Sequence, residues 1–334
     1  MMMSRLILML GGLSGLLLWA QKENPWQEIT YPCPHDNSRQ PAMYYQAKGE
    51  EARPLLVALH TWSGGYTQNC SGYANFCVQK NWHFIFPNFR GPNNNPQALG
   101  SELMVADIVA AVEFVKQSAK VDARRIYLIG GSGGGHATLL LAGRHPEVWA
   151  AASAWCPISD VLAWHQECAL AQRGYAAQIE KACGGNPASS PEAQAEAIRR
   201  SPVTYLAAAK DLPLDIATGI HDGHTGSVPV SHSLRAFNIL ARPEDRIPEE
   251  DIQYITARQA IPEHYAPPAP DPIYSGKHKL HFRKQSNRVR VTLFEGGHSI
   301  LSNVGLRWLE KQCRGQEPVW EIGPLQAEAS ALDR

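Results

Sequence analysis

One five-residue segment, Gly130-Gly131-Ser132-Gly133-Gly134, constrains the fold of this chain more than any other feature. Residues 125–129 precede it and are apolar and β-branched, as is typical of a buried parallel strand. Residues 136–144 follow it and are rich in alanine and leucine, as is typical of a packed helix. The segment therefore predicts a sharp turn from strand to helix. Glycines two residues before and after Ser132 let neighbouring backbone approach without Cβ clashes, so the serine hydroxyl stands clear of the sheet.

Two more candidate catalytic residues follow along the chain. Asp222 comes just after the apolar run 214–220, and His298 comes after the alternating run 289–294 in a Glu-Gly-Gly-His motif. A serine hydroxyl becomes a good nucleophile when an imidazole takes its proton, and the imidazole needs an acid to hold its tautomer. Serine, acid and histidine in this order, each past the carboxyl end of a strand, are typical of an α/β-hydrolase. The sequence predicts a serine hydrolase with Ser132, Asp222 and His298 as its catalytic residues.

Predicted strands alternate with predicted helices along the chain. Apolar residues recur at helical spacing between residues 103 and 119, which predicts a helix there. Such alternation with right-handed crossovers predicts an α/β fold with a mostly parallel, doubly wound sheet. The predicted strands cover residues 55–60, 83–87, 125–129, 149–156, 214–220 and 289–294.

Two segments interrupt this alternation within a single predicted domain, residues 21–320. Residues 159–209 are rich in Ala, Glu and Gln and predict a helical cap inserted after a strand. Residues 242–287 hold many prolines, so regular structure throughout is excluded. Such insertions either shape a pocket or decorate the surface, and the sequence leaves both open. Residues 321–334 are interpreted as a C-terminal tail.

The N-terminus predicts a secretory signal over residues 1–20. Arg5 supplies a positive charge ahead of the apolar stretch 6–19, which is short for a membrane span, and Ala20 is a suitable cleavage residue. The alternative is a retained N-terminal anchor. We therefore expect a secreted or periplasmic protein without stable membrane association after cleavage.

Charge and cysteine content limit the partners and the redox chemistry that we expect. Lysine plus arginine and aspartate plus glutamate number 31 each, which gives no reason to expect nucleic acid as a partner.

Seven cysteines leave at least one thiol free in an exported chain. Cys156, in an apolar run, is the best candidate for an inert buried thiol. Cys168 with Cys183 is the pairing to test first, whereas Cys70 and Cys77 would lie too far apart on one helix to bridge.

An oxyanion hole needs two backbone N–H groups aimed at the developing alkoxide. Gly133, directly after the nucleophile, supplies one. The turn after the strand at residues 55–60 supplies the other; Trp62 is the first choice and Thr61 the second. The Trp62 indole also fits a role in covering the pocket floor.

Several polar residues admit a second interpretation. His221, Asp222 and His224 could be metal ligands, but their loose spacing favours histidines packed around the acid, and we expect no metal and no cofactor. Asp160 is the alternative acid. His136 fits helix–sheet packing better than catalysis, and Arg90 fits a substrate carboxylate or a structural ion pair.

Motifs along most of the chain resemble the catalytic domain of the prolyl oligopeptidase family, from about residue 50 to residue 312. The resemblance implies a nucleophile at Ser132, a catalytic histidine at His298, and cleavage of peptide or ester bonds through an acyl-enzyme. The motifs are Gly130-Gly131-Ser132-Gly133-Gly134, Val228-Pro229-Val230-Ser231-His232-Ser233, Glu295-Gly296-Gly297-His298, Ser201-Pro202-Val203-Thr204-Tyr205 and Asn88-Phe89-Arg90-Gly91.

Two departures from the family pattern matter. The family usually carries a propeller domain ahead of the hydrolase, whereas residues 21–54 alone would precede the first predicted strand after signal removal, so an open site is expected. Family members also carry the acid three residues before the Val-Pro pair, where this chain has Thr225. Asp222 lies three residues further back, so a longer turn must bring it to His298.

These observations favour a secreted esterase, with an acylated carbohydrate as one candidate substrate. The first alternative is a serine peptidase of prolyl oligopeptidase type, and the second is a catalytically inactive binding module. Expected partners are therefore a small-molecule, carbohydrate-ester or peptide substrate.

Overall fold

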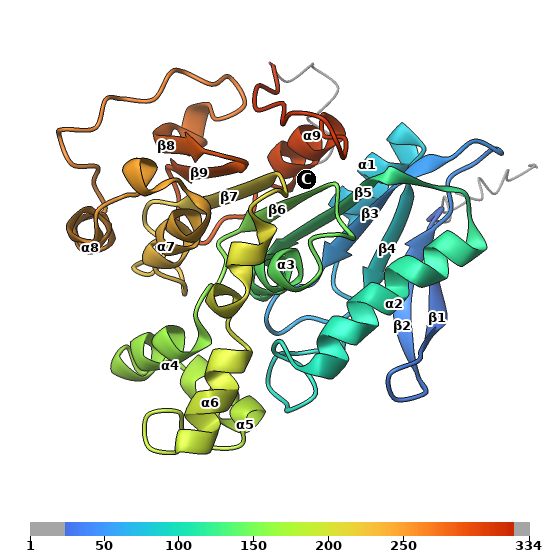
Figure 1. Ribbon diagram of the computed structural model, residues 1–334, viewed down its shortest axis with the longest axis horizontal. Helices are drawn as coiled ribbons and strands as arrows, with labels where there is room; N and C mark the ends of the chain where they lie inside the picture. Colours follow the sequence, from blue (N-terminus) through green and yellow to red (C-terminus); the bar gives the residue numbers. More distant parts are fainter. Residues whose placement is uncertain (1–23, 324–334) are drawn as a thin grey trace, which may run out of the picture.

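Residues 24–323, which the computed structural model describes, contain a nine-stranded sheet with the order β1-β2-β4-β3-β5-β6-β7-β9-β8 (Figure 1). The six strands from β4 to β9 in this order run parallel, and β1, β2 and β8 pair antiparallel at the two sides. A mostly parallel sheet with helices confirms the predicted fold class. The strands are β1 (Gln27–Cys33), β2 (Ser38–Tyr45), β3 (Arg53–Leu59), β4 (His83–Pro87), β5 (Val121–Gly131), β6 (Ala151–Trp155), β7 (Leu214–Gly219), β8 (Leu280–Ser286) and β9 (Val289–Phe294).

Helices cover both faces of the sheet, which explains why β4, β6, β7 and β9 are buried along their whole length. In β3, Leu55 and Val57 join one buried cluster and Leu56 and Ala58 join the other, because successive side chains point to opposite faces. The first cluster includes side chains of α2, α3 and α7, and the second includes side chains of α1 and α9. These helices are α1 (Ser71–Lys80), α2 (Glu102–Ser118), α3 (Gly133–Arg144), α7 (Ser231–Leu240) and α9 (Ser302–Glu310).

The three antiparallel strands are strands that the sequence did not predict. β1 is exposed at most of its positions and β2 contains Pro41, so neither has the apolar run of a central strand. β8 carries Arg283 and Lys284 among alternating buried positions. Strands at the sides of a sheet need only one buried face, which leaves a weak sequence signal.

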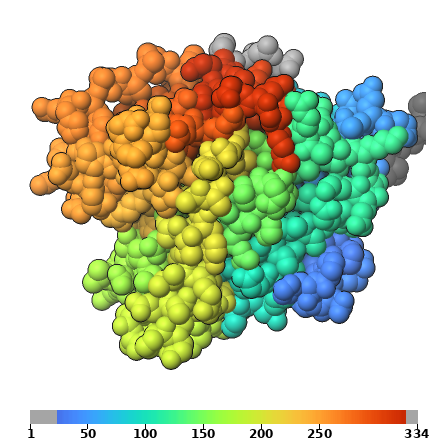
Figure 2. Space-filling view, in the orientation of Figure 1, coloured from blue at the N-terminus to red at the C-terminus, as the bar shows by residue number. Residues whose placement is uncertain are grey.

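The segment predicted as a cap contains three helices between β6 and β7. They are α4 (Val161–Leu170), α5 (Tyr175–Cys183) and α6 (Pro191–Arg199), followed by the short 3₁₀ turns η1 (Pro202–Thr204) and η2 (Leu206–Ala209). In the view of Figure 1 the three helices lie together below the sheet, and in the space-filling view they form a lobe that continues into the rest of the molecule (Figure 2). We call these three helices the cap.

The proposed disulfide in the cap is wrong. Cys168 of α4 and Cys183 of α5 both carry free thiols. Both side chains lie in the buried apolar cluster of the cap, where they act as small hydrophobic groups.

The proline-rich segment 242–287 mixes regular and irregular structure. It holds η3 (Pro243–Asp245), α8 (Glu249–Arg258), η4 (Gly276–His278) and all of β8, with a long irregular stretch after α8 (Figure 1). The predicted signal at residues 1–20 and most of the predicted tail lie outside the described residues. Among the described helices, none is both long and apolar enough to cross a membrane.

Candidate active site

Ser132 occupies the turn between β5 and α3. Its backbone has φ 58° and ψ −120°, a conformation that a residue with a side chain adopts only at a cost of about 1–3 kcal/mol. The Ser132 N–H donates to the carbonyl of Trp155 (2.8 Å), and the Ser132 carbonyl accepts from the N–H of His136 (2.8 Å). Bonds to β6 and to the first turn of α3 therefore hold the strained serine in place.

The glycines around Ser132 are required by close backbone contacts. A Cβ on Gly130 would lie 2.4 Å from the carbonyl oxygen of Gly134, and a Cβ on Gly134 would lie 2.5 Å from that of Leu59. No side chain fits at these distances, so the two glycines permit the close packing of β5, α3 and β3 that the sequence motif predicts.

Asp222 and His298 form a direct pair at the carboxyl edge of the sheet. His298 Nδ1 lies 2.7 Å from Asp222 Oδ2, which also accepts from Thr218 Oγ1 (3.3 Å). Asp222 Oδ1 accepts from the N–H groups of Gly223 (2.9 Å) and Val228 (3.1 Å). The carboxylate is buried, and four donors to one buried carboxylate stabilise its negative charge.

The loop after Asp222 explains how the acid can lie three residues earlier in the sequence than in the family pattern. Residues 223–228 fold back over the carboxylate, so that the Val228 N–H reaches Oδ1 while Thr225 Oγ1 donates to the carbonyl of His221 (3.4 Å). A Cβ on Gly226 would lie 2.2 Å from Asp222 Oδ1 and 2.7 Å from the His298 Cβ. A glycine at this position allows the longer turn to pass between the acid and the histidine.

The loop that carries His298 also lies against the serine turn. A Cβ on Gly131 would meet Ile300 Cδ1 at 2.2 Å, and Ile300 is two residues beyond His298. Ser132 is 8% exposed, and its hydroxyl makes no hydrogen bond to any described residue. Before substrate binds, such a hydroxyl is often not yet bonded to its base.

Two backbone N–H groups lie together beside Ser132. A Cβ on Gly133 would lie 2.6 Å from the backbone nitrogen of Trp62, so the two chain segments touch. The carbonyl of Thr61 accepts from the Gly64 N–H (3.1 Å), which fixes the planar peptide that contains the Trp62 N–H. Gly133 begins α3, so its own N–H has no partner within the helix. The backbone nitrogens of Gly133 and Trp62 are therefore close neighbours, and they remain the candidates for the oxyanion hole.

The Trp62 side chain anchors the cap rather than remaining free. Its Nε1 donates to Gln178 Oε1 of α5 (2.5 Å), and its ring packs edge-on against Trp164 of α4 at 4.7 Å between ring centroids. Trp164 Nε1 donates to the carbonyl of Ser227, and Arg173 donates to the carbonyl of Gly223. The cap thus contacts both the Trp62 turn and the loop after Asp222. Nothing in the sequence pointed to Gln178 or Arg173, because a polar residue in a predicted cap carries no signal of its partner.

The alternative candidates have other contacts. Asp160 caps α4, with its carboxylate accepting from the Ala163 N–H (3.0 Å). Arg90 pairs with Asp107 (2.6 Å) and Asp36 (2.8 Å), which makes it a structural cation. His136 Nε2 lies 2.8 Å from the carbonyl of Arg200, and burial lowers the pKa of this imidazole to about 4.

A histidine–carboxylate cluster flanks the Asp222–His298 pair. Glu295 Oε1 lies 2.7 Å from His221 Nε2, and Glu295 Oε2 lies 2.7 Å from His281 Nε2. These contacts, with that of His281 the larger, lower the pKa of the Glu295 carboxyl. His224 faces the carbonyl of Thr256 instead, so His221 and His224 do not converge on one point. The cluster ties the two loops that carry Asp222 and His298.

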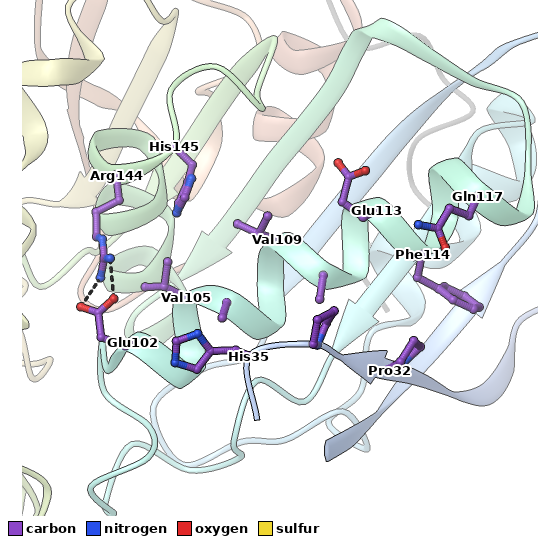
Figure 3. Close-up of a pocket in the computed structure, with 13 residues that line it drawn as sticks. Pro32, His35, Glu102, Val105, Val109, Glu113, Phe114, Gln117, Arg144 and His145 are labelled. Atoms are coloured by element: carbon purple, nitrogen blue, oxygen red, sulfur yellow. Dashed lines mark hydrogen bonds and ion pairs between the residues drawn. The ribbon is translucent and has the colours of Figure 1, made fainter. Parts of the chain in front are cut away.

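A separate groove of about 640 Å³ runs along α2 (Figure 3). Val105, Val109 and Phe114 line its floor, and the ion pair of Glu102 with Arg144 closes one end. None of the candidate catalytic residues lines this groove. It is therefore distinct from the site at the carboxyl edge of the sheet.

Comparison with protein families gives one match that covers more than half of the chain. The model of the prolyl oligopeptidase family matches residues 73–257. This segment includes the turn with Ser132, the cap, and the loop with Asp222.

Two curated relatives come from rice, Oryza sativa subsp. japonica. Acylamino-acid-releasing enzyme 1 is 29% identical over 131 residues, which are 36% of this chain and 16% of the relative. Acylamino-acid-releasing enzyme 2 is 24% identical over 250 residues, which are 65% of this chain and 31% of the relative. The chain thus spans less than a third of either relative.

A similar solved structure is that of an acylaminoacyl peptidase from Pyrococcus horikoshii. The TM-score is 0.60 at 15% sequence identity, and the match covers 89% of this chain and 43% of the peptidase. At this identity the likeness concerns the fold alone. It agrees with the sheet and helices described above.

Proposed function

The chain belongs to the prolyl oligopeptidase family and is a serine hydrolase, and from this premise we propose that it is a peptidase that cleaves short peptides through an acyl-enzyme. The observation that carries the proposal is the contact of His298 Nδ1 with the buried Asp222 carboxylate, beside the strained turn that presents Ser132. This contact leaves Nε2 of the same ring as the basic nitrogen.

In acylation, Ser132 Oγ attacks the carbonyl carbon of the scissile amide and His298 Nε2 takes the hydroxyl proton. Asp222 stabilises the imidazolium that forms and keeps the ring in its orientation. The N–H groups of Gly133 and Trp62 donate to the negatively charged oxygen of the tetrahedral intermediate. The intermediate collapses when the imidazolium gives its proton to the leaving amine.

In deacylation, a water molecule takes the place of the amine. His298 Nε2 removes a proton from the water as its oxygen attacks the ester carbonyl of acylated Ser132. The same two N–H groups hold the second oxyanion, and the proton returns to the serine oxygen. Each stage uses the same His298–Asp222 pair, so loss of either residue affects both.

The family match and the relatives favour a peptide substrate over the acylated carbohydrate that the sequence analysis put first. The finer proposal is a peptide whose terminal amine is acylated, and it draws support from the names of the two curated relatives. An acylated terminus is neutral, so the bound substrate brings no ammonium group that must be desolvated.

A matched set of substrates tests both the peptidase proposal and the finer proposal of a peptide with an acylated terminal amine. Purified protein is assayed with N-acetyl-alanine p-nitroanilide, with the free-amine alanine p-nitroanilide, and with an acetylated xylo-oligosaccharide, and the Ser132→Ala variant is the control. We expect the highest kcat/KM for the acetylated anilide. Fast release of acetate from the sugar with inert anilides would contradict the peptidase proposal. A preference for the free amine would contradict only the acylated-peptide class.

Export is a second, separate proposal that rests on the Arg5-led apolar segment within residues 1–20. Expression of the full chain in a bacterium with a secretory pathway, followed by mass measurement of the mature protein, tests it. Loss of about the first 20 residues is expected, and an intact N-terminus in the cytoplasm would contradict export.

A further inference from the structure

A free thiol lies next to the Asp222–His298 pair. Cys156 directly follows β6 and is 1% exposed, and its sulfur donates to the carbonyl of Ser299 (3.3 Å). One ligand atom each from Cys156, Asp222 and His298 lie within 4.8 Å of one another, and no other such group of three occurs in the part of the chain that the structure describes. The proposed hydrolytic mechanism makes no use of this thiol.

Sulfur, imidazole nitrogen and carboxylate oxygen form a donor set that suits Zn²⁺ and other soft divalent cations. In a tetrahedral zinc site with bonds of about 2.0–2.3 Å, donor atoms lie roughly 3.3–3.6 Å apart. The three donors here lie within 4.8 Å of one another, so no pair of them needs to close by more than about 1.5 Å. The 2.7 Å contact of Nδ1 with Oδ2 would open by roughly 0.6–0.9 Å to admit the ion.

We propose that Cys156, Asp222 and His298 form an inhibitory binding site for a soft divalent cation such as Zn²⁺, an inference that rests on the proposed catalytic roles of the last two residues. Water occupies the fourth position of the ion. The site would switch the hydrolase off reversibly, without any change in the covalent structure of the protein.

Every proton that moves in the proposed binding step is accounted for. The Cys156 thiol gives its proton to solvent and forms the metal–sulfur bond. The lone pair of His298 Nδ1 binds the ion, so the ring proton moves to Nε2. A ring protonated at Nε2 has no lone pair there to accept the proton of Ser132, and Asp222 is bound to the metal instead of the ring. One proton is released for each ion bound.

One consequence distinguishes this site from general metal inhibition. The sulfur ligand favours Zn²⁺ and Cd²⁺ over Mg²⁺ and Ca²⁺, which prefer oxygen donors.

The test is a Zn²⁺ titration of the full chain in a buffer that does not bind metals. Activity is followed with p-nitrophenyl acetate, an activated ester that reports on a serine hydrolase whichever natural substrate it takes. We expect inhibition by micromolar Zn²⁺, full recovery with excess EDTA, and no inhibition by Mg²⁺. Cys156→Ala and the more conservative Cys156→Ser should raise the half-inhibitory concentration at least about tenfold, because each removes one strong ligand.

Two control variants test whether Zn²⁺ inhibits the enzyme at the Cys156 site. Cys168→Ala removes a buried thiol of the cap and should leave the half-inhibitory concentration unchanged. His281→Ala breaks the Glu295 cluster, which is the competing histidine–carboxylate group near the site. Equal inhibition of the wild type and both Cys156 variants would overturn the proposal, as would loss of inhibition in His281→Ala alone or no inhibition at millimolar Zn²⁺.

A second measurement separates this proposal from the proposed function. Co²⁺ is titrated into the protein, and thiolate-to-cobalt absorption in the near ultraviolet is recorded for the wild type and for Cys156→Ala. Absorption that only the wild type shows would support the metal site even if no ester or amide were hydrolysed. Absence of the band in the wild type would overturn the site whatever the activity.

Discussion

Replacement of Asp222 by asparagine should reduce kcat by about 10⁴-fold, which is about 5 kcal/mol of transition-state stabilisation. The structure determines how the new amide would lie. The N–H groups of Gly223 and Val228 both donate to Oδ1, so the amide oxygen must take this position. The amide NH₂ group then takes the position of Oδ2, which lies 2.7 Å from His298 Nδ1.

An NH₂ group at this position donates to Nδ1 and so selects the tautomer of His298 that carries its proton on Nε2. That tautomer cannot accept the proton of Ser132, and a neutral amide does not stabilise the imidazolium. Because the substitution preserves the shape of the side chain and both backbone hydrogen bonds, the unfolding midpoint should change little. The loss should therefore appear in kcat and not in the amount of folded protein.

The assay measures kcat with p-nitrophenyl acetate at neutral pH, together with thermal unfolding. Asp160→Asn is the matched control, because Asp160 caps α4 and asparagine is an equally good N-cap residue. An Asp222→Asn variant within tenfold of the wild type would refute the assignment. So would a large loss in Asp160→Asn with near-normal Asp222→Asn.

Three further substitutions test the structure around the site. Gln178→Ala leaves the indole N–H of Trp62 without its acceptor, so kcat should fall about tenfold with a smaller change in KM. An unchanged kcat would show that the cap does not hold the turn that carries the Trp62 N–H. Arg90→Ala leaves the fully buried Asp107 carboxylate unpaired and should cost about 3–5 kcal/mol in urea unfolding, and a cost below about 1 kcal/mol would contradict this. Because burial lowers the pKa of His136 to about 4, the unfolded chain binds a proton below about pH 6.5 that the folded chain does not bind. Stability should therefore fall by up to about 3 kcal/mol between about pH 6.5 and 4, and His136→Gln should flatten this dependence; an equally steep dependence in the variant would assign it to other groups.

The centre of the fold was predictable because it depends on local pattern. Short apolar or alternating runs of sequence form β3, β4, β7 and β9. The predicted bounds of these strands lie within a residue or two of those observed. The serine turn was predictable for a similar reason, since glycines at fixed spacing around Ser132 meet a local geometric need.

Contacts between distant segments were not predictable. Trp62 and Gln178 are 116 residues apart, and nothing in either segment indicates the other. The same holds for Glu295 with His221, which are 74 residues apart and belong to different loops. Such pairs depend on how the cap and the strand ends meet in space.

The cysteines show the limit of spacing arguments most clearly. Cys168 and Cys183 lie on adjacent helices, as a disulfide would require, yet each packs into the cap as a free thiol. Cys156 was expected to be buried, and it is, but its position beside Asp222 and His298 follows only from the sheet order. Burial follows from the local sequence, whereas the identity of a neighbour does not.

The central claim is that Ser132 is the nucleophile of a hydrolase, and one labelling experiment tests it most directly. The full chain is incubated with a fluorophosphonate, digested, and analysed by mass spectrometry for the residue that carries the phosphonyl group. We expect a single adduct on Ser132, which is absent in Ser132→Ala and forms much more slowly in His298→Ala. An adduct on another serine, or no adduct on correctly folded protein, would contradict it.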